Sequence, residues 1–271
     1  MSNSPGRQTA AGSQAARRWA EELVAWAVPA EILDAAPRRP HVFSPEMFTA
    51  PPPGGPLSRS SSIAAEALAD GGAVLDVGCG GGAAAFAVAP PATSLFGTDR
   101  QPDMLALFER TAAERGLPAR TVLGSWPDIA EQVPTADVVV CHHVLYNAAD
   151  IVGFATALHD HAARRVVLES TERHPQVTRA PLWRHFWNLD RPSGPTAVLA
   201  AEALQAAGFP VHLERSAPTE RDDVPAAGVE AAFWCRQLCL PPQREPEVAA
   251  LLPGLPFPTD RVTLWWDTSS R

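Results

Sequence analysis

The sequence predicts a doubly wound α/β fold, in which helices cover both faces of one mainly parallel sheet. Short apolar runs alternate with helical patterns from residue 73 onward, as in successive βαβ units. Val138-Val139-Val140 is apolar at every position, which is typical of a strand buried on both faces. The run 74–77 leads directly into the turn Gly78-Cys79-Gly80-Gly81-Gly82. A turn of this kind marks the carboxyl edge of the sheet, where ligands bind.

Seven strands are expected, and the last is expected to be antiparallel to the others. The predicted strands are 73–77, 93–98, 120–123, 136–141, 165–169, 210–216 and 261–267. The predicted helices between them are 82–89, 102–115, 127–132, 149–162 and 195–207, and 219–252 is expected to be a helical excursion. Gly116-Leu117-Pro118 ends one helix, because glycine suits the left-handed C-terminal position and proline cannot continue a helix.

Two segments stand outside this alternation. Residues 1–56 are expected to form an N-terminal arm and helical cap, with a helix over 13–28 and a proline-rich connector over 36–56. A further helix is expected from Ser58 to about residue 69. The segment 171–195 is rich in proline and aromatic residues, and we interpret it as a lid insertion over the carboxyl edge of the sheet.

Composition excludes several classes of function. The chain has 271 residues, 46% of them hydrophobic, which is enough for one large domain. A net charge of -8 argues against a broad nucleic-acid surface. All 22 basic residues are arginine, so chemistry that requires a lysine, including the phosphate-binding P-loop, is excluded. We expect a cytoplasmic protein, because the sequence shows no membrane span, secretory signal or disulfide framework. The protein is expected to be a monomer or homodimer.

No metal site is expected either. Cys235-x-x-x-Cys239 lacks a second ligand pair, and His159-x-His161 lies at a helix end. The consecutive residues Cys141-His142-His143 cannot all converge on one ion.

The glycine turn alone leaves two cofactors open. Gly78-x-Gly80-x-x-Ala83, followed by Asp99 at the end of the next strand, also satisfies the dinucleotide-binding pattern. Asp76 decides between them, because an anion two residues before the first glycine would repel a pyrophosphate at the helix N-terminus. S-adenosylmethionine (SAM) has no phosphate and brings an ammonium and a sulfonium group to this turn. The sequence therefore favours SAM over NAD.

A family resemblance becomes specific at residues 137–147, Asp-Val-Val-Val-Cys-His-His-Val-Leu-Tyr-Asn. With Leu75–Gly80 and Asp99, this stretch resembles the class I SAM-dependent methyltransferases, the methyltransferase-domain family with a seven-stranded Rossmann-like sheet. The resemblance covers about 58–270, is loose after 171, and is to the small-molecule type. It implies a methyltransferase domain over 57–271, with SAM as methyl donor. The cofactor-binding residues that we predict are Asp76, Gly78, Gly80, Asp99, Arg100, Met104, Ser125, Trp126 and His142.

One departure from the family narrows the substrate. The branches that methylate adenine or amides carry Asn/Asp-Pro-Pro-aromatic after the fourth strand, where this chain has Cys141-His142-His143-Val144. Methylation of a nucleobase amine by that route is therefore not expected, and the predicted partner is a small molecule rather than nucleic acid or membrane.

The expected reaction is methyl transfer to an O or N atom by in-line displacement, which mainly requires alignment and exclusion of water. His143, Tyr146 and His185 are the candidate catalytic residues, with His143 as a general base. The alternative interpretation is that both His142 and His143 are ordinary loop histidines. An NAD(P)-dependent oxidoreductase and a non-catalytic SAM-binding protein remain alternative functions.

Overall fold

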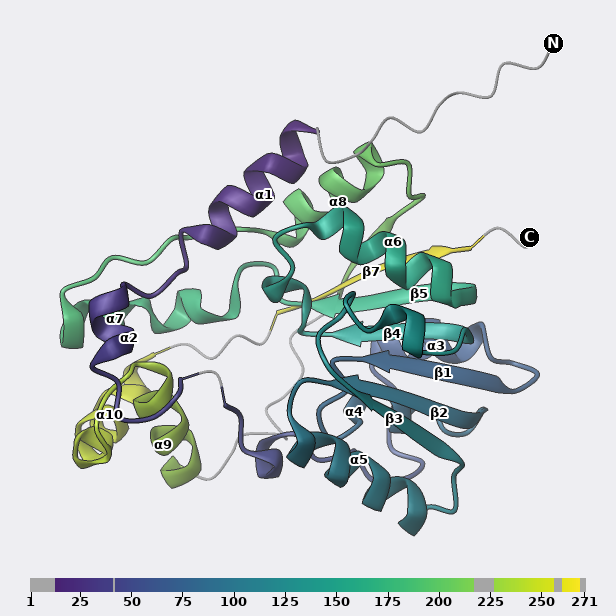
Figure 1. Ribbon diagram of the computed structural model, residues 1–271, viewed down its shortest axis with the longest axis horizontal. Coiled ribbons are helices and arrows are strands. Elements are labelled where there is room, and N and C mark those ends of the chain that lie inside the picture. Colours follow the sequence, from purple (N-terminus) through teal and green to yellow (C-terminus); the bar gives the residue numbers. More distant parts are fainter. Residues whose placement is uncertain (1–12, 41, 217–226, 256–259, 269–271) are drawn as a thin grey trace.

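A seven-stranded sheet with the order β3-β2-β1-β4-β5-β7-β6 forms the centre of the protein (Figure 1). The computed structural model describes residues 13–40, 42–216, 227–255 and 260–268. Strands β1 to β5 pair in parallel, and β7 is antiparallel to both β5 and β6. The predicted doubly wound sheet with an antiparallel last strand is confirmed.

The strands begin and end within a few residues of the predicted positions. They are β1 (Gly72–Val77), β2 (Ala92–Asp99), β3 (Ala119–Leu123), β4 (Ala136–His142), β5 (Ala162–Ser170), β6 (His212–Ser216) and β7 (Arg261–Asp267). The main helices are α1 (Gln14–Val24), α2 (Ala30–Asp34), α3 (Arg59–Glu66), α4 (Ala83–Ala87), α5 (Pro102–Glu114), α6 (Ile151–His161), α7 (Ala180–Trp187), α8 (Ala197–Ala206), α9 (Ala227–Gln237) and α10 (Glu245–Leu251). Within the predicted helix 127–132, only a short 3-10 turn, Ala130–Gln132, is helical. Residues 1–12 and 219–226 of the predicted arm and excursion lie outside the described residues.

Asp137 fixes the amino ends of the central strands. Its Oδ2 accepts a hydrogen bond of 2.8 Å from the backbone N–H of Ala73, and its Oδ1 lies 3.0 Å from Nε of Arg164. Gly72, with φ +146°, lies directly beside this carboxylate, since a Cβ there would be 2.5 Å from Oδ2. One side chain therefore connects β1, β4 and β5, and their carboxyl ends meet at the opposite edge.

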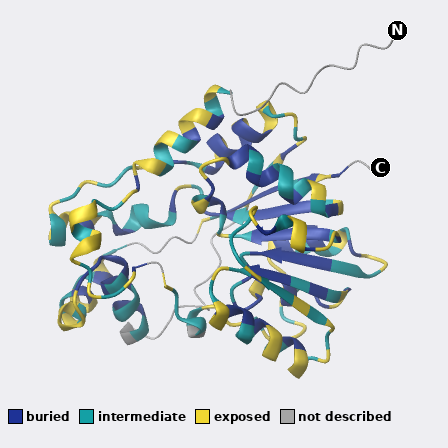
Figure 2. Cartoon of the chain, viewed as in Figure 1, coloured by how far each residue is buried: buried dark blue, intermediate teal, exposed yellow. Residues whose placement is uncertain are grey.

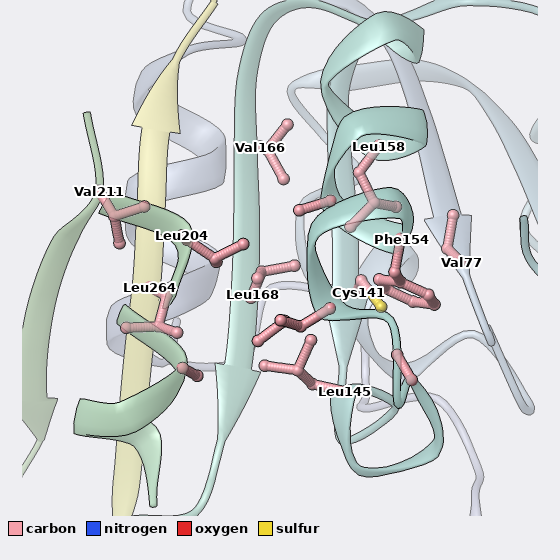
Figure 3. Packing of buried hydrophobic residues seen from close by; sticks show 14 of the residues in the cluster. Val77, Cys141, Leu145, Phe154, Leu158, Val166, Leu168, Leu204, Val211 and Leu264 are labelled. Carbon is pink, nitrogen blue, oxygen red and sulfur yellow. The ribbon is translucent and has the colours of Figure 1, made fainter. Parts of the chain in front are cut away.

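Two apolar layers enclose the sheet, and the strands between them are its most buried part (Figure 2). On one face, α1, α6 and α8 pack through residues such as Phe154, Leu158 and Leu204 (Figure 3). On the other face, α3, α4 and α5 pack against Val74, Val138 and Val140. Each fully buried side chain of this size contributes roughly 1.5–3 kcal/mol, so the sheet is a rigid platform for groups at its edge.

A third, separate core was not anticipated. It joins α7 of the predicted lid insertion to α9 and α10 of the later excursion through Leu182, Trp183, Trp234, Leu238 and Val248. These helices lie together with α2 beside the sheet (Figure 1). We call the unit formed by α7, α9 and α10 the helical lobe. The sequence does not indicate that these helices pack together, because contacts between residues more than forty positions apart leave no local sequence pattern.

In the described part of the chain, no helix has the length and apolar character needed to cross a membrane.

Candidate active site

The glycine turn after β1 requires glycine for two different reasons. Gly78, Gly80 and Gly82 have φ values of +70°, +51° and +88°, a region that residues with a Cβ rarely adopt. At Gly78 a Cβ would also lie 2.4 Å from Cγ2 of Val144. The turn therefore packs directly against the segment that follows β4. Cys79 within it is buried, and burial raises the pKa of its thiol, so it is not a nucleophile.

Asp76 lies behind the turn, at the N-terminus of α4. It is 1% exposed, and its Oδ2 accepts a hydrogen bond of 3.1 Å from the backbone N–H of Ala85. Burial raises its pKa to about 7, although the Ala85 hydrogen bond opposes this shift. The helix N-terminus already faces a carboxyl group, so the position is unsuited to a pyrophosphate.

Asp99 ends β2 and connects it to the turn. Its Oδ2 accepts from the backbone N–H of Gly80 at 3.0 Å, and its Oδ1 accepts from the N–H of Gln101 at 2.9 Å. Gln101 continues the chain of contacts, because its side-chain amide accepts from the N–H of Phe43 at 2.8 Å and donates to the carbonyl of Phe43 at 3.0 Å. The connector between α2 and α3 is therefore fixed at the carboxyl edge, a contact that no local sequence pattern indicates.

The other predicted cofactor residues surround the same edge. Met104 is buried in the first turn of α5, whereas Arg100 is exposed. Ser125 and Trp126 follow β3 and are half-buried. The indole N–H of Trp126 is shielded from solvent and has no hydrogen-bond partner among the described residues.

His142 is the last residue of β4 and lies next to Glu169 of β5 in the parallel register. Its Nε2 is shielded and lacks a partner within the described part of the chain. Burial lowers the pKa of the ring to about 4, so the imidazole is neutral at physiological pH. Because buried polar atoms are normally hydrogen-bonded, the ring nitrogen of His142 and the indole N–H of Trp126 are suited to a polar ligand. Together with the glycine cradle and Asp99, they fit the adenosyl and amino-acid groups of SAM.

His143 is connected by hydrogen bonds to side chains from two other elements of the structure. Its Nε2 lies 3.1 Å from Oε1 of Glu169, and Oε2 of Glu169 accepts a hydrogen bond of 2.5 Å from Oγ of Ser60. Sequence reasoning missed Glu169 and Ser60. One signal was present: Glu169 ends a predicted strand, as Asp76 and Asp99 do.

Tyr146 and His185 do not join His143. The hydroxyl of Tyr146 accepts from the backbone N–H of Thr171 at 2.5 Å and bonds Oγ1 of Thr171 at 2.7 Å. These hydrogen bonds fix the tyrosine to the start of the lid insertion. His185 lies on α7, and its Nε2 pairs with Glu247 of α10 at 2.9 Å. The structure thus places both residues apart from His143, and their catalytic roles stay predictions.

Arg184 and Arg191 of the lid insertion make contacts within the protein. Arg191 lies over the rings of Trp26 and Trp183, 4.9 Å from each centroid, and donates to the carbonyl of Trp26. Arg184 pairs with Asp190. Both side chains stabilise the lid insertion.

The fold and the residues at this edge resemble those of the class I SAM-dependent methyltransferases. Residues 75–168 match the family model described as a methyltransferase domain. This match supports the SAM-dependent methyltransferase and the SAM cofactor that the sequence predicted.

Two solved structures illustrate the shared fold. Magnesium protoporphyrin IX methyltransferase from Synechocystis PCC 6803, with bound S-adenosylhomocysteine, is 15% identical with a TM-score of 0.52, and the match covers 83% of this chain and 91% of that one. The YcgJ protein from Bacillus subtilis is 17% identical with a TM-score of 0.52, over 77% and 97%. At these identities the similarity concerns the fold alone. No curated protein matches the chain in sequence.

Proposed function

We propose that this enzyme methylates an oxygen or nitrogen atom of a small-molecule acceptor, with His143 as general base. The observation that carries this proposal is the pairing of His143 with Glu169, 3.1 Å apart, at the carboxyl edge next to the glycine turn. A base contributes where the acceptor must lose a proton, typically by a factor of about 100 to 10,000.

The cofactor is held by the residues that ring this edge. Asp99 is assigned to the ribose hydroxyls, and Gly78 and Gly80 to close backbone contact. Met104, Ser125 and Trp126 are assigned to the adenine, with Arg100 at the exposed margin, and His142 and Asp76 to the amino-acid end. When bound, SAM supplies a methyl group already activated by its sulfonium. The protein contributes alignment of the acceptor and exclusion of water.

The acceptor side is assigned to the N-terminal cap, residues 1–56, and the lid insertion at about 171–195, set on the methyltransferase domain of 57–271. Trp26 of the cap donates to the carbonyl of Gly194 at 2.5 Å and stacks on His174. Cap and lid are thus one cover, which is suited to an acceptor enclosed on several sides.

Isothermal titration calorimetry tests the cofactor assignment. S-adenosylhomocysteine and SAM are expected to bind with micromolar affinity, and NADH is not. Asp99→Asn should weaken the binding of both SAM and S-adenosylhomocysteine. Asp103→Asn, which changes an exposed carboxylate on the next helix, should not. Binding of SAM without methyl transfer to any phenol, alcohol or amine tested would instead favour a non-catalytic SAM-binding protein.

A further inference from the structure

Three side chains from separate parts of the chain form a connected polar chain at the carboxyl edge. Ser60 lies in the first turn of α3, Glu169 near the end of β5, and His143 just after β4. Oγ of Ser60 is 2.5 Å from Oε2 of Glu169, whose Oε1 is 3.1 Å from Nε2 of His143. Ser60 is fully buried and the side chain of Glu169 is 12% exposed, whereas that of His143 is 42% exposed. These hydrogen bonds thus connect a buried hydroxyl in the core to an exposed imidazole.

The charge of Glu169 fixes the direction of these hydrogen bonds. Burial raises its pKa, but the hydrogen bond from His143, the nearby charges of His142 and His143 and the hydroxyl of Ser60 together lower it well below the usual range. The guanidinium of Arg261 lies 3.6 Å from the same carboxylate. An ionised carboxylate only accepts hydrogen bonds, so Nε2 of His143 carries the proton. In the neutral ring, Nδ1 therefore carries the lone pair that can accept a proton.

The backbone of His143 is held in an unusual conformation. Its φ is +59°, in the left-handed region, and its N–H donates to the carbonyl of Glu169 at 2.8 Å. The next residue, Val144, packs against Gly78 in the glycine turn. Such strain persists only where neighbouring contacts enforce it, and it is common at functional sites. The imidazole is thus fixed beside the cofactor turn by two independent attachments.

We propose that Ser60 and Glu169 are positioning residues that hold His143 with Nδ1 as the proton acceptor, and that the methyl acceptor is a neutral phenol or enol hydroxyl. This inference rests on the function proposed above and specifies its substrate class.

The bond changes are balanced without a further reagent. The acceptor oxygen forms a bond to the methyl carbon while the bond from that carbon to sulfur breaks and leaves its electron pair on sulfur. The hydroxyl proton passes to Nδ1 of His143, and the imidazolium is stabilised through Nε2–H by the Glu169 carboxylate. The proton then leaves from Nδ1 to water.

Other acceptors match this arrangement less well. A carboxylate is already ionised at neutral pH, needs no base and would be repelled by Glu169. A neutral amine attacks through its lone pair and can lose its proton to water afterwards. A phenol, with a pKa of about 10 like the tyrosine side chain, gains most from an aligned base.

Nuclear magnetic resonance tests the positioning without any acceptor. In the complex with S-adenosylhomocysteine, the ring ¹⁵N shifts of His143, assigned by their loss in His143→Gln, are expected to show the Nε2–H tautomer. Glu169→Gln should shift the ring toward a tautomer mixture. Glu172→Gln, which removes a half-buried carboxylate paired with Arg215, should not. An Nδ1–H tautomer in the wild type, or no response to Glu169→Gln, would overturn the positioning role.

A series of substituted phenols tests the substrate class. Wild type is expected to methylate weakly and strongly acidic phenols at similar rates. In His143→Gln and Glu169→Gln, turnover of unsubstituted phenol should fall by about 100-fold, but that of 4-nitrophenol, ionised at mildly alkaline pH, by less than about 10-fold. The acidic limb of the kcat/KM profile should move to lower pH in Glu169→Gln. Ser60→Ala should have a smaller effect of the same kind, and Ser61→Ala, its neighbour on α3, none.

The two levels of the proposal fail differently. Loss of S-adenosylhomocysteine binding in the wild type would contradict the proposed function itself. Equal losses on all phenols, turnover of amines alone, or no turnover of any phenol would contradict the hydroxyl assignment while cofactor binding stands. Thermal melting and S-adenosylhomocysteine affinity, measured for each variant, identify any that fails to fold.

Discussion

Asp76 Oδ2 accepts a hydrogen bond of 3.1 Å from the backbone N–H of Ala85, so a buried carboxyl group joins the end of β1 to the first turn of α4. The residue that distinguishes a cationic cofactor from a phosphate-bearing one therefore also caps a helix. Its two roles respond differently to pH and to substitution, which makes them separable by experiment.

Asp76→Asn is expected to keep the fold but weaken the cofactor complex. The folded pKa of Asp76, about 7, is above its ordinary value of 3.8, so the folded protein binds the proton more tightly. Wild-type stability should therefore fall as pH rises from about 4 to 7, by up to about 1.4 kcal/mol per unit. The variant, measured by urea unfolding, should gain stability relative to wild type over that window, while its affinity for S-adenosylhomocysteine falls by roughly 10-fold or more. The same pH dependence in both proteins would contradict this account; Asp103→Asn is the control.

Gly78→Ala tests the contact between the glycine turn and the segment after β4. The new Cβ would lie 2.4 Å from Val144, so Val144 and with it His143 must move. Gly116→Ala is the matched control, because Gly116 has φ +65° but no atom within 4 Å of a Cβ. Both variants should lose about 1 kcal/mol from backbone strain. Only Gly78→Ala should also lose S-adenosylhomocysteine binding, by calorimetry; equal binding in the two variants would show that the contact is unimportant.

The sequence predicted the sheet well because its signals are local. Apolar runs, glycine turns and proline stops define each strand and helix, and parallel strands place Asp76 and Asp99 at one edge whatever the loops do. Local signals of this kind did not predict the helical lobe. Its core contains both Trp183 and Trp234, and the sequence around one does not indicate the other.

The contacts within the candidate site were only partly predictable for the same reason. His143 was found from its place after β4, but the partner that orients it, Glu169, lies on another strand. The partners of Tyr146 were not predicted, because a residue type indicates what a hydroxyl can do and not where its hydrogen bonds go. In the structure both of its hydrogen bonds go to Thr171.

The buried ion pair of the helical lobe should matter far more than an exposed one. Arg179 lies 3.2 Å from Glu230, with 2% and 11% of their side chains exposed, and Arg179 also lies over the ring of Trp234. Glu230→Gln is expected to destabilise the protein by roughly 3 kcal/mol, because it removes the carboxylate charge that lies beside a buried guanidinium. Arg215→Met, which breaks the more exposed pair with Glu172, should cost under about 1 kcal/mol. Urea unfolding followed by tryptophan fluorescence measures both, and similar losses would refute the distinction.

His174 should make the cover sensitive to acid. Its ring stacks on Trp26 at 4.0 Å and meets Tyr146 edge-on, and burial, with a smaller effect from the Arg191 charge, lowers its pKa to about 3 from 6.5. The unfolded chain therefore binds the proton more tightly, so this contribution to stability is complete above about pH 6.5 and is lost as pH falls toward 3.

His174→Phe keeps an aromatic ring on Trp26 and removes the titration. Between pH 7 and 5 the variant should lose roughly 1–2 kcal/mol less stability than wild type, measured by urea unfolding. His142 also has a lowered pKa but is present in both proteins, so its effect cancels in the comparison. Parallel pH profiles for the two proteins would show that His174 is not the sensitive group.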